Sequence, residues 1–206
     1  MNLGRADEAV SDFNEALRIN PEYPEAYLRL GELFKEREPE KAKEIICNLL
    51  PFVARIGVFV NESTDKVIEI AKSINLTGIQ LHGNEPQKVC DKVREHFPVI
   101  KAFSVSNEDD IKQALNYKGI IPLFDTKSPQ YGGTGKNFNW NLLLPFKDKF
   151  KQFILSGGLT PENVKKAITL LSPFAVDVST GVEKSPGIKD KAKMIKFIKN
   201  AKQGGS

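Results

Sequence analysis

The sequence predicts an α/β fold in which parallel strands alternate with helices. From residue 55 onward, short apolar segments alternate with amphipathic segments in six consecutive strand–helix units. The last two apolar segments are each followed by a run of small residues, at positions 156–159 and 177–181. Strands that alternate with helices in this way pair in parallel through right-handed crossovers.

Composition excludes several classes of protein. With 206 residues, 40% of them apolar and 27% charged, the chain can bury a core and is not of the disordered class. The 30 basic residues are interleaved with 26 acidic ones. The sequence has no basic patch with interspersed aromatic residues, so it does not predict nucleic-acid binding. No apolar run has membrane-spanning length, and no signal-peptide profile is present.

Cysteine usage favours a reducing, cytoplasmic location. The chain has two cysteines, Cys47 and Cys90, with no CxxC spacing and no clustered histidines. Neither a disulfide framework nor a metal site is therefore expected. Residues 204–206, Gly-Gly-Ser, are typical of a linker remnant.

The first 50 residues carry only helical periodicity. Apolar spacing predicts helices over residues 5–19, 24–35 and 39–50, each ended or opened by proline. Residues 1–38 resemble about one and a half tetratricopeptide repeats. A stable array of such repeats usually contains at least about three. Two interpretations follow: a helical cap on the rest of the chain, or a peptide-binding groove. The repeat register is carried by Gly4, Ala9, Phe13, Ala16, Pro21, Tyr27, Leu30, Gly31 and Phe34.

After residue 55 the spacing of apolar residues is no longer purely helical, and this change predicts the later strands and helices. Each apolar segment is too short for a helix and reads as a buried strand. Ser63 or Thr64 and Asn107 are candidate helix caps, and Pro161 lies just inside another helix start. The expected strands are 56–60, 78–81, 99–103, 120–124, 153–155 and 174–178. The expected helices are 64–74, 85–97, 107–117, 140–150, and two that begin near 161 and 189.

Polar residues stand at the carboxyl ends of these strands, where α/β enzymes keep their active sites. They are Asn61, His82, Asp125, Ser156 and Asp177. Asp125 ends an apolar strand, which suits either a general acid or a loop-capping aspartate. His82 is either a satisfied structural histidine or a ligand contact. His82 and Asp177 are thus candidates for substrate binding.

The runs at 156–159 and 177–181 are candidates for a phosphate site. Glycine lets backbone N–H groups approach an anion closely, and a helix start follows the first run. In (β/α)8 barrels such a cradle follows the seventh and eighth strands. The alternative is a pair of ordinary strand-to-helix turns. A third glycine-rich loop, 126–136, fits a lid or a second anion site, but its spacing is not that of a Walker motif.

Seven motifs in order resemble the phosphoribosylanthranilate isomerase family, over about residues 40–202. They are IGVFVN at 56–61, QLHG at 80–83, IKA at 100–102, FDT at 124–126, YGGTGK at 131–136, SGGL at 156–159 and VDVSTGVE at 176–183.

The resemblance implies a (β/α)8 barrel that performs an Amadori rearrangement without a metal or organic cofactor. A general acid protonates the furanose oxygen, and a base then removes the C2′ proton. By motif, the acid is Asp125. The partner implied is the phosphorylated sugar–anthranilate substrate, or phosphate itself, held at Gly157, Gly158, Ser179, Thr180 and Gly181.

The chain departs from the family at its start. The family opens with a strand ending in Cys-Gly-Ile-Thr, whose cysteine is the base, and a later arginine holds the anthranilate. Neither motif is present, and neither Cys47 nor Cys90 matches the base. The resemblance therefore implies a partial barrel of six units at 39–203, behind a repeat-like hairpin, in an impaired or inactive isomerase.

Two other interpretations stay open for the whole chain. It is either a repeat-based binding module carried by a barrel, or an engineered chimera of two folds without catalysis. Loss of two strands also predicts unpaired sheet edges at 55–61 and 174–178. Such edges favour tighter closure of the sheet or a homo-oligomer formed by pairing between chains.

Overall fold

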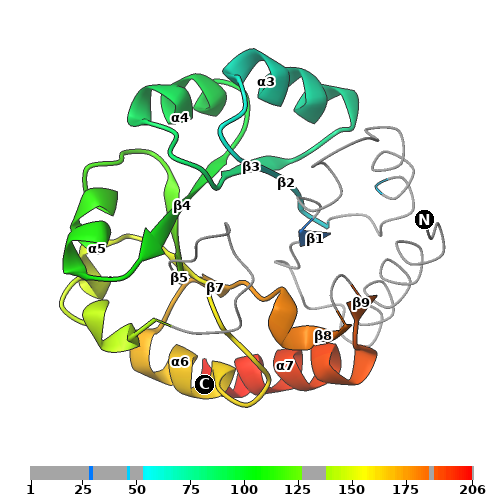
Figure 1. The fold of residues 1–206 in the computed structure, drawn as a ribbon, viewed down its shortest axis with the longest axis vertical. Coiled ribbons are helices and arrows are strands. Elements are labelled where there is room, and N and C mark those ends of the chain that lie inside the picture. The colour runs from blue at the N-terminus through cyan, green and yellow to red at the C-terminus, as the bar shows by residue number, and fades with distance from the viewer. Residues whose placement is uncertain (1–27, 30–45, 47–52, 127–137, 186–187, 206) are drawn as a thin grey trace. The chain divides into compact units, whose positions relative to one another are not determined.

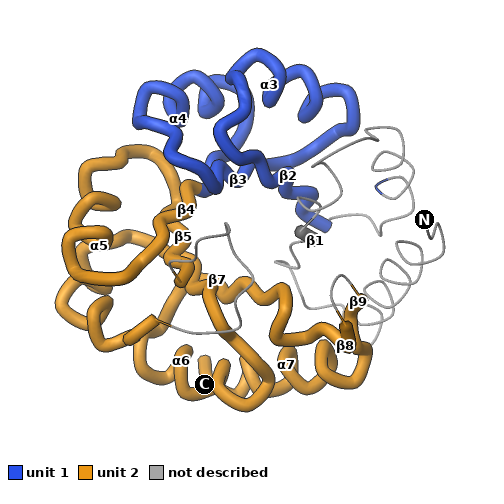
Figure 2. The backbone as a smooth tube through the Cα atoms, viewed as in Figure 1, with its two compact units in different colours: residues 1–100 blue, residues 101–206 orange. Residues whose placement is uncertain are grey.

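The computed structural model describes residues 28–29, 46, 53–126, 138–185 and 188–205 (Figure 1). The chain divides into two compact units, Met1–Ile100 and Lys101–Ser206 (Figure 2). Within the described residues no helix is long and apolar enough to cross a membrane.

The first unit contains three parallel strands in the order β1-β2-β3. All four residues of β3 are buried, with Gln80 on the face opposite Ile79 and Leu81, as expected of a strand covered on both faces. The helices follow their strands, and each turns a short apolar stripe inward, such as Val67 and Ala71, one turn apart. The elements are β1 Leu28–Arg29, β2 Arg55–Phe59, α3 Thr64–Ser73, β3 Gly78–Leu81 and α4 Gln87–Arg94.

The short strand β1 corrects two predictions. Helical spacing predicted a helix over 24–35, but Leu28 and Arg29 are extended and pair in parallel with Arg55 and Ile56. Pairing to the edge of β2 satisfies backbone groups that a helix there would leave open. The predicted unpaired edge at 55–61 is therefore wrong at this register.

The second unit contains β4 to β7, again in sequence order, with β5–β6 and β6–β7 paired in parallel. The division between the units falls inside β4, after Ile100. Its strands and α-helices are β4 Val99–Val105, α5 Glu108–Ala114, β5 Ile121–Thr126, β6 Ile154–Leu155, α6 Val164–Leu171, β7 Ala175–Val176, β8 Glu183–Ser185, β9 Ile188–Lys189 and α7 Lys191–Gly204. Its 3-10 helices are η1 Trp140–Leu142, η2 Lys147–Lys149 and η3 Thr180–Val182.

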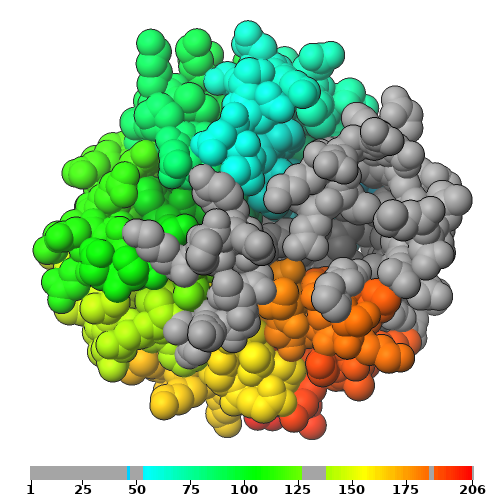
Figure 3. Space-filling model, viewed as in Figure 1, coloured from blue at the N-terminus to red at the C-terminus, as the bar shows by residue number. Residues whose placement is uncertain are grey.

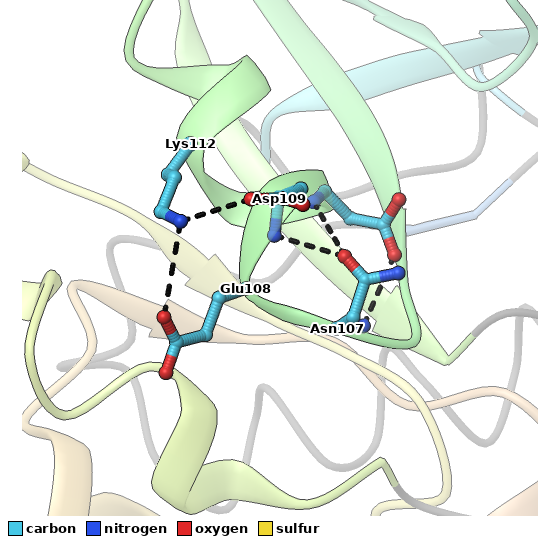
Figure 4. Close-up of polar contacts among 5 residues, drawn as sticks. Asn107, Glu108, Asp109 and Lys112 are labelled. Carbon is cyan, nitrogen blue, oxygen red and sulfur yellow. Dashed lines mark hydrogen bonds and ion pairs between the residues drawn. The ribbon is translucent and has the colours of Figure 1, made fainter.

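The start of α5 is capped as the sequence predicts (Figure 4). The Asn107 side chain accepts hydrogen bonds from the backbone N–H groups of Asp109 and Asp110, at 2.9 and 3.2 Å. Asp110 returns the contact by accepting from the Asn107 N–H, which completes a capping box. Lys112 donates to Asp109 at 2.9 Å, and this bond raises the pKa of the lysine above its ordinary value.

The predicted helix over 140–150 is wrong. The backbone forms the 3-10 helices η1 and η2, in which hydrogen bonds join residues three positions apart, such as Leu143 N to Trp140 O. Pro145 has no N–H and cannot continue an α-helical ladder, which is the physical reason. The antiparallel pair β8–β9 was not predicted either.

Other predictions lie outside the described residues. They concern the remainder of the repeat-like segment 1–38 with Phe13, Tyr27 and Phe34, then Cys47 and the glycine-rich loop. Ile46, in the predicted helix 39–50, is helical and buried.

An aromatic cluster forms the centre of the second unit. Phe124 of β5 is fully buried, and its ring centroid lies 5.2 Å from that of Phe150 and 5.9 Å from that of Phe153. Phe103 of β4 lies 6.2 Å away and contacts Tyr117 edge to face at 5.0 Å. Such pairs add to the free energy of burial. Phe124 immediately precedes Asp125, so the cluster anchors the strand end that carries this carboxylate.

We expect Phe124→Ala to lower the free energy of unfolding by about 3–5 kcal/mol, because it empties this cluster. Phe174→Ala is the control, since Phe174 is 38% exposed and its loss should change stability by at most about 0.5 kcal/mol. Denaturant unfolding of both variants measures the difference. Equal losses would show that the cluster is not the core of this unit.

Candidate active site

The register of the parallel strands brings three polar residues into line in the second unit. Phe124 pairs with Leu155, and Leu155 with Val176. The residues that follow these positions are Asp125, Ser156 and Asp177. Backbone bonds continue the ladder there, from Ser156 N to Phe124 O at 2.8 Å and from Asp177 N to Leu155 O at 2.9 Å. These three residues therefore lie side by side at the carboxyl ends of their strands.

The Asp125 carboxyl is buried, with the residue only 4% exposed. Its Oδ1 accepts a hydrogen bond from the Thr126 N–H at 2.7 Å. The Thr126 hydroxyl oxygen in turn accepts from Phe138 N at 3.0 Å. These contacts hold the carboxyl group in one orientation at the strand end.

Gly157 passes directly over this carboxyl group. Its φ is +83°, and a Cβ at this position would overlap the Thr126 N–H and hydroxyl and lie 2.8 Å from Asp125 Oδ1. Only glycine combines this left-handed conformation with so close an approach. The glycine predicted to hold phosphate therefore also packs against the predicted acid.

Ser156 and Asp177 are joined directly. The Ser156 hydroxyl donates to Asp177 Oδ2 at 2.9 Å, and Ser156 is 4% exposed. Because a carboxylate can only accept, the serine is the donor. Asp177 is half-buried and therefore accessible to a ligand, whereas the Ser156 side chain that holds it is buried.

The two small-residue loops touch through their backbones. A Cβ on Gly181 would overlap the carbonyl oxygen of Leu159, which leaves no room for any side chain between them. Segments near residues 160 and 180, yellow and orange, lie next to each other in the space-filling view (Figure 3). The arrangement fits the predicted cradle of Gly157, Gly158, Ser179, Thr180 and Gly181.

The loop after β6 is fixed by a side-chain clip that sequence reasoning missed. Asn163 accepts from Thr160 N at 2.8 Å and donates to Gly158 O at 2.9 Å. Nearby, Lys196 of α7 donates to Glu162 at 2.9 Å, and this bond lowers the pKa of the exposed glutamate below its ordinary value.

His82 belongs to the first unit and is buried, at 5% exposure. Its Nδ1 lies 2.7 Å from Gln80 Nε2. This contact orients the imidazole ring at the end of β3. The predicted site residues of the two loops belong to the other unit.

Glu85 is a buried residue of the first unit that sequence reasoning missed. Its carboxylate accepts from Asn61 N at 2.8 Å and from Gly83 N at 2.9 and 3.1 Å. Asn61, with φ +53°, accepts from Asn84 N at 2.7 Å. The contacts tie together the loops after β2 and β3. A charged residue two positions after His82-Gly83 was the available signal.

Among the described residues, no group of three or more histidine, cysteine or acidic side chains is placed to hold a metal ion. The described cysteine, Cys90, is fully buried on α4.

Comparison with known proteins decides the family. Residues 20–200 match the family model of N-(5'phosphoribosyl)anthranilate (PRA) isomerase. The chain belongs to the phosphoribosylanthranilate isomerase family.

Individual isomerases of the family are closely similar to this chain. The enzyme of Thermotoga maritima is 54% identical over 164 residues, which is 80% of this chain and 80% of that protein. A crystal structure of phosphoribosyl anthranilate isomerase from the same organism aligns with TM-score 0.84 and 46% identity, covering 95% of this chain and 93% of that chain. Another solved isomerase, in complex with reduced 1-(o-carboxyphenylamino)-1-deoxyribulose 5-phosphate, has TM-score 0.80 and 43% identity, over 95% and 93% of the two chains. These likenesses confirm the predicted α/β class and the isomerase resemblance.

Residues 1–36 also match a family model of the tetratricopeptide repeat. The match confirms the resemblance predicted for the N-terminal segment. It overlaps the isomerase match over residues 20–36, and the strand β1 lies inside this overlap.

We expect Gly157→Ala to lower the free energy of unfolding by about 1–3 kcal/mol, because alanine is strained at positive φ and would displace Thr126. Gly205→Ala is the control, since a Cβ there meets nothing within 4 Å, and its effect should stay within about 0.5 kcal/mol. Thermal or denaturant unfolding measures both. A neutral Gly157→Ala would mean that the loop does not rest on the Asp125 strand end.

Proposed function

We propose that this chain of the isomerase family binds the phosphorylated sugar–anthranilate substrate and supplies the general acid of the rearrangement, but lacks its general base. The observation that carries the proposal is the position of Asp125. Its Oδ1 lies 2.8 Å from where a Gly157 Cβ would stand, so acid and phosphate loop adjoin. The ligand in the solved relative is itself a carboxyphenylamino sugar phosphate.

Asp125 acts in the first step. Its carboxyl group donates a proton to the furanose ring oxygen, the C1′–O bond breaks, and the sugar opens to a Schiff base. The hydrogen bond that Asp125 Oδ1 accepts from the Thr126 N–H holds the carboxyl group in one orientation at the strand end. In the second step a base would remove the C2′ proton, giving an enolamine that tautomerises to the ketone.

Asp177 and His82 are proposed to contact the substrate. Asp177, held by Ser156, can accept a hydrogen bond from a substrate N–H or hydroxyl group. The His82 ring, oriented by its contact with Gln80, is the proposed contact from the first unit. The phosphate group is assigned to the backbone of Gly157, Gly158, Ser179, Thr180 and Gly181, where glycine allows close approach.

The general base is the missing part. Cys90 is 0% exposed inside the first unit, so the substrate cannot reach its thiol. This thiol therefore cannot remove the C2′ proton of the substrate. Cys47 lies outside the described residues, and the family's Cys-Gly-Ile-Thr motif does not occur in the sequence. The C2′ proton would then leave to water.

The division at residue 38 into a repeat-like segment and an isomerase part remains a proposal, as do the cytoplasmic location and the chimeric origin. The tetratricopeptide match supports the division, whereas the extended Leu28–Arg29 counts against a complete repeat helix. Association of two chains through the outer edge of β7, which ends the sheet order, is proposed as well.

We expect inorganic phosphate to bind with a dissociation constant in the millimolar range, about 4 kcal/mol. The amide resonances of Gly157, Gly158, Thr180 and Gly181 should shift in a saturable titration followed by NMR. Shifts confined to the lysine-rich helix α7 would instead indicate unspecific charge binding and contradict the cradle.

We expect no isomerase turnover above background, because loss of one acid–base partner alone costs about 10²–10⁴ in rate. Turnover and oligomeric state should be measured on the same preparation. If weak activity is seen, Asp125→Asn should abolish it, and activity that survives belongs to a contaminating enzyme. Robust turnover that is lost on replacing Cys47 or Cys90 would show that the base is present after all.

A further inference from the structure

Lys189, the last residue of β9, makes three contacts beside the proposed phosphate loop. Its ammonium group donates to the Ser179 carbonyl oxygen at 3.1 Å, to the Ser179 hydroxyl oxygen at 3.3 Å and to Glu183 Oε1 at 2.7 Å. An ammonium group has three N–H donors, so these contacts use all of them. The Glu183 side chain is only 9% exposed, and the register of β8 and β9 places Glu183 opposite Lys189. The lysine is therefore anchored from one side while it holds the loop on the other.

The contact to the Ser179 carbonyl sets the direction of the next N–H group. A trans peptide unit is planar, and its C=O and N–H bonds point to opposite sides. No cis peptide is present among the described residues. The Ser179 oxygen is held by Lys189 and also accepts from Val182 N at 3.4 Å. Fixing this oxygen on the side of β9 turns the Thr180 N–H away from β9.

The contact to the hydroxyl group sets its polarity. An ammonium group can only donate, so the Ser179 Oγ is the acceptor in this bond. The hydroxyl hydrogen is then left to be donated to another oxygen. One lysine thus prepares two donors of the loop, the Thr180 N–H and the Ser179 O–H.

We infer that Lys189 is a positioning residue for phosphate, which holds the Ser179 carbonyl and hydroxyl oxygens so that Thr180 N–H and Ser179 O–H are presented to the anion. The inference rests on the proposed function, because it assumes that this loop receives phosphate. It extends that proposal to a residue with a role separate from direct contact, since Glu183 already neutralises the lysine charge at 2.7 Å.

The test is a titration of the full chain with inorganic phosphate, followed through the Thr180 and Gly181 amide resonances. Lys189→Met should weaken phosphate binding about tenfold or more, because charge-assisted hydrogen bonds that organise the loop are lost. The Thr180 resonance should also move in the phosphate-free variant. Lys189→Arg should recover most of the affinity, since a guanidinium group can donate to the same oxygens.

Lys193→Met is the matched control. Lys193 donates to the Glu183 carbonyl oxygen at 2.7 Å, so it belongs to the same cluster and its loss changes the net charge equally. It makes no described contact with Ser179, and its loss should alter phosphate affinity by no more than about twofold, as screening of a solvent-exposed charge allows.

Each outcome decides the inference. Weakened binding in Lys189→Met with recovery in Lys189→Arg supports it. Unchanged binding in Lys189→Met, or an equal loss in Lys193→Met, overturns it while the phosphate site stands. If the wild-type chain does not bind phosphate, the proposed function fails together with the inference. Should Lys189→Met not fold, Lys189→Gln replaces it, because the shorter amide can no longer bridge Glu183 and Ser179, and the same loss is expected.

Discussion

The parallel register of β5, β6 and β7 is the constraint on which the candidate site depends. Phe124, Leu155 and Val176 pair across the strands, and the next residue of each strand is polar. The backbone ladder, rather than any side-chain contact, therefore sets the spacing of Asp125, Ser156 and Asp177. The aromatic cluster beneath Phe124 keeps the first of these strands in place, so packing below the strand ends supports the polar chemistry at them.

Much of this arrangement could be predicted from the sequence. Buried parallel strands have a distinctive composition, and strand ends are marked by the first polar residue, as at Asp125 and Asp177. The cap at Asn107 could be predicted as well, because a capping box depends only on residues within one turn. Two other local predictions fared differently: Ser63 occupies the N-cap of α3 without a side-chain hydrogen bond, and α6 begins at Val164, so Pro161 lies before this helix and the prediction that it lies just inside is wrong.

Features that depend on contacts between distant residues could not be predicted in the same way. Lys189 looks like an ordinary surface residue in the sequence, and its contact with Ser179 forms because the β8–β9 pair folds back beside that loop. The contacts of Asn163 with Gly158 and Thr160 are local and were overlooked. The prediction of a helix over 140–150 gave too much weight to apolar spacing and too little to Pro145. The proline interrupts the α-helical hydrogen bonds, and the segment forms 3-10 helices instead. Leu28–Arg29 shows the opposite case, because its helical pattern is overridden by an available sheet edge.

The pairing of β1 with β2 also shows what a sheet edge requires of the segment that joins it. A sheet edge is recognised through peptide N–H and C=O groups, which every residue except proline supplies in full. The edge therefore selects poorly among sequences, and its demand is for an extended backbone of the right polarity. A segment whose side chains predict a helix, such as Leu28–Arg29, can therefore pair there once its backbone is extended. The edge of a parallel sheet is accordingly the position at which pairing constrains the side chains of a strand least.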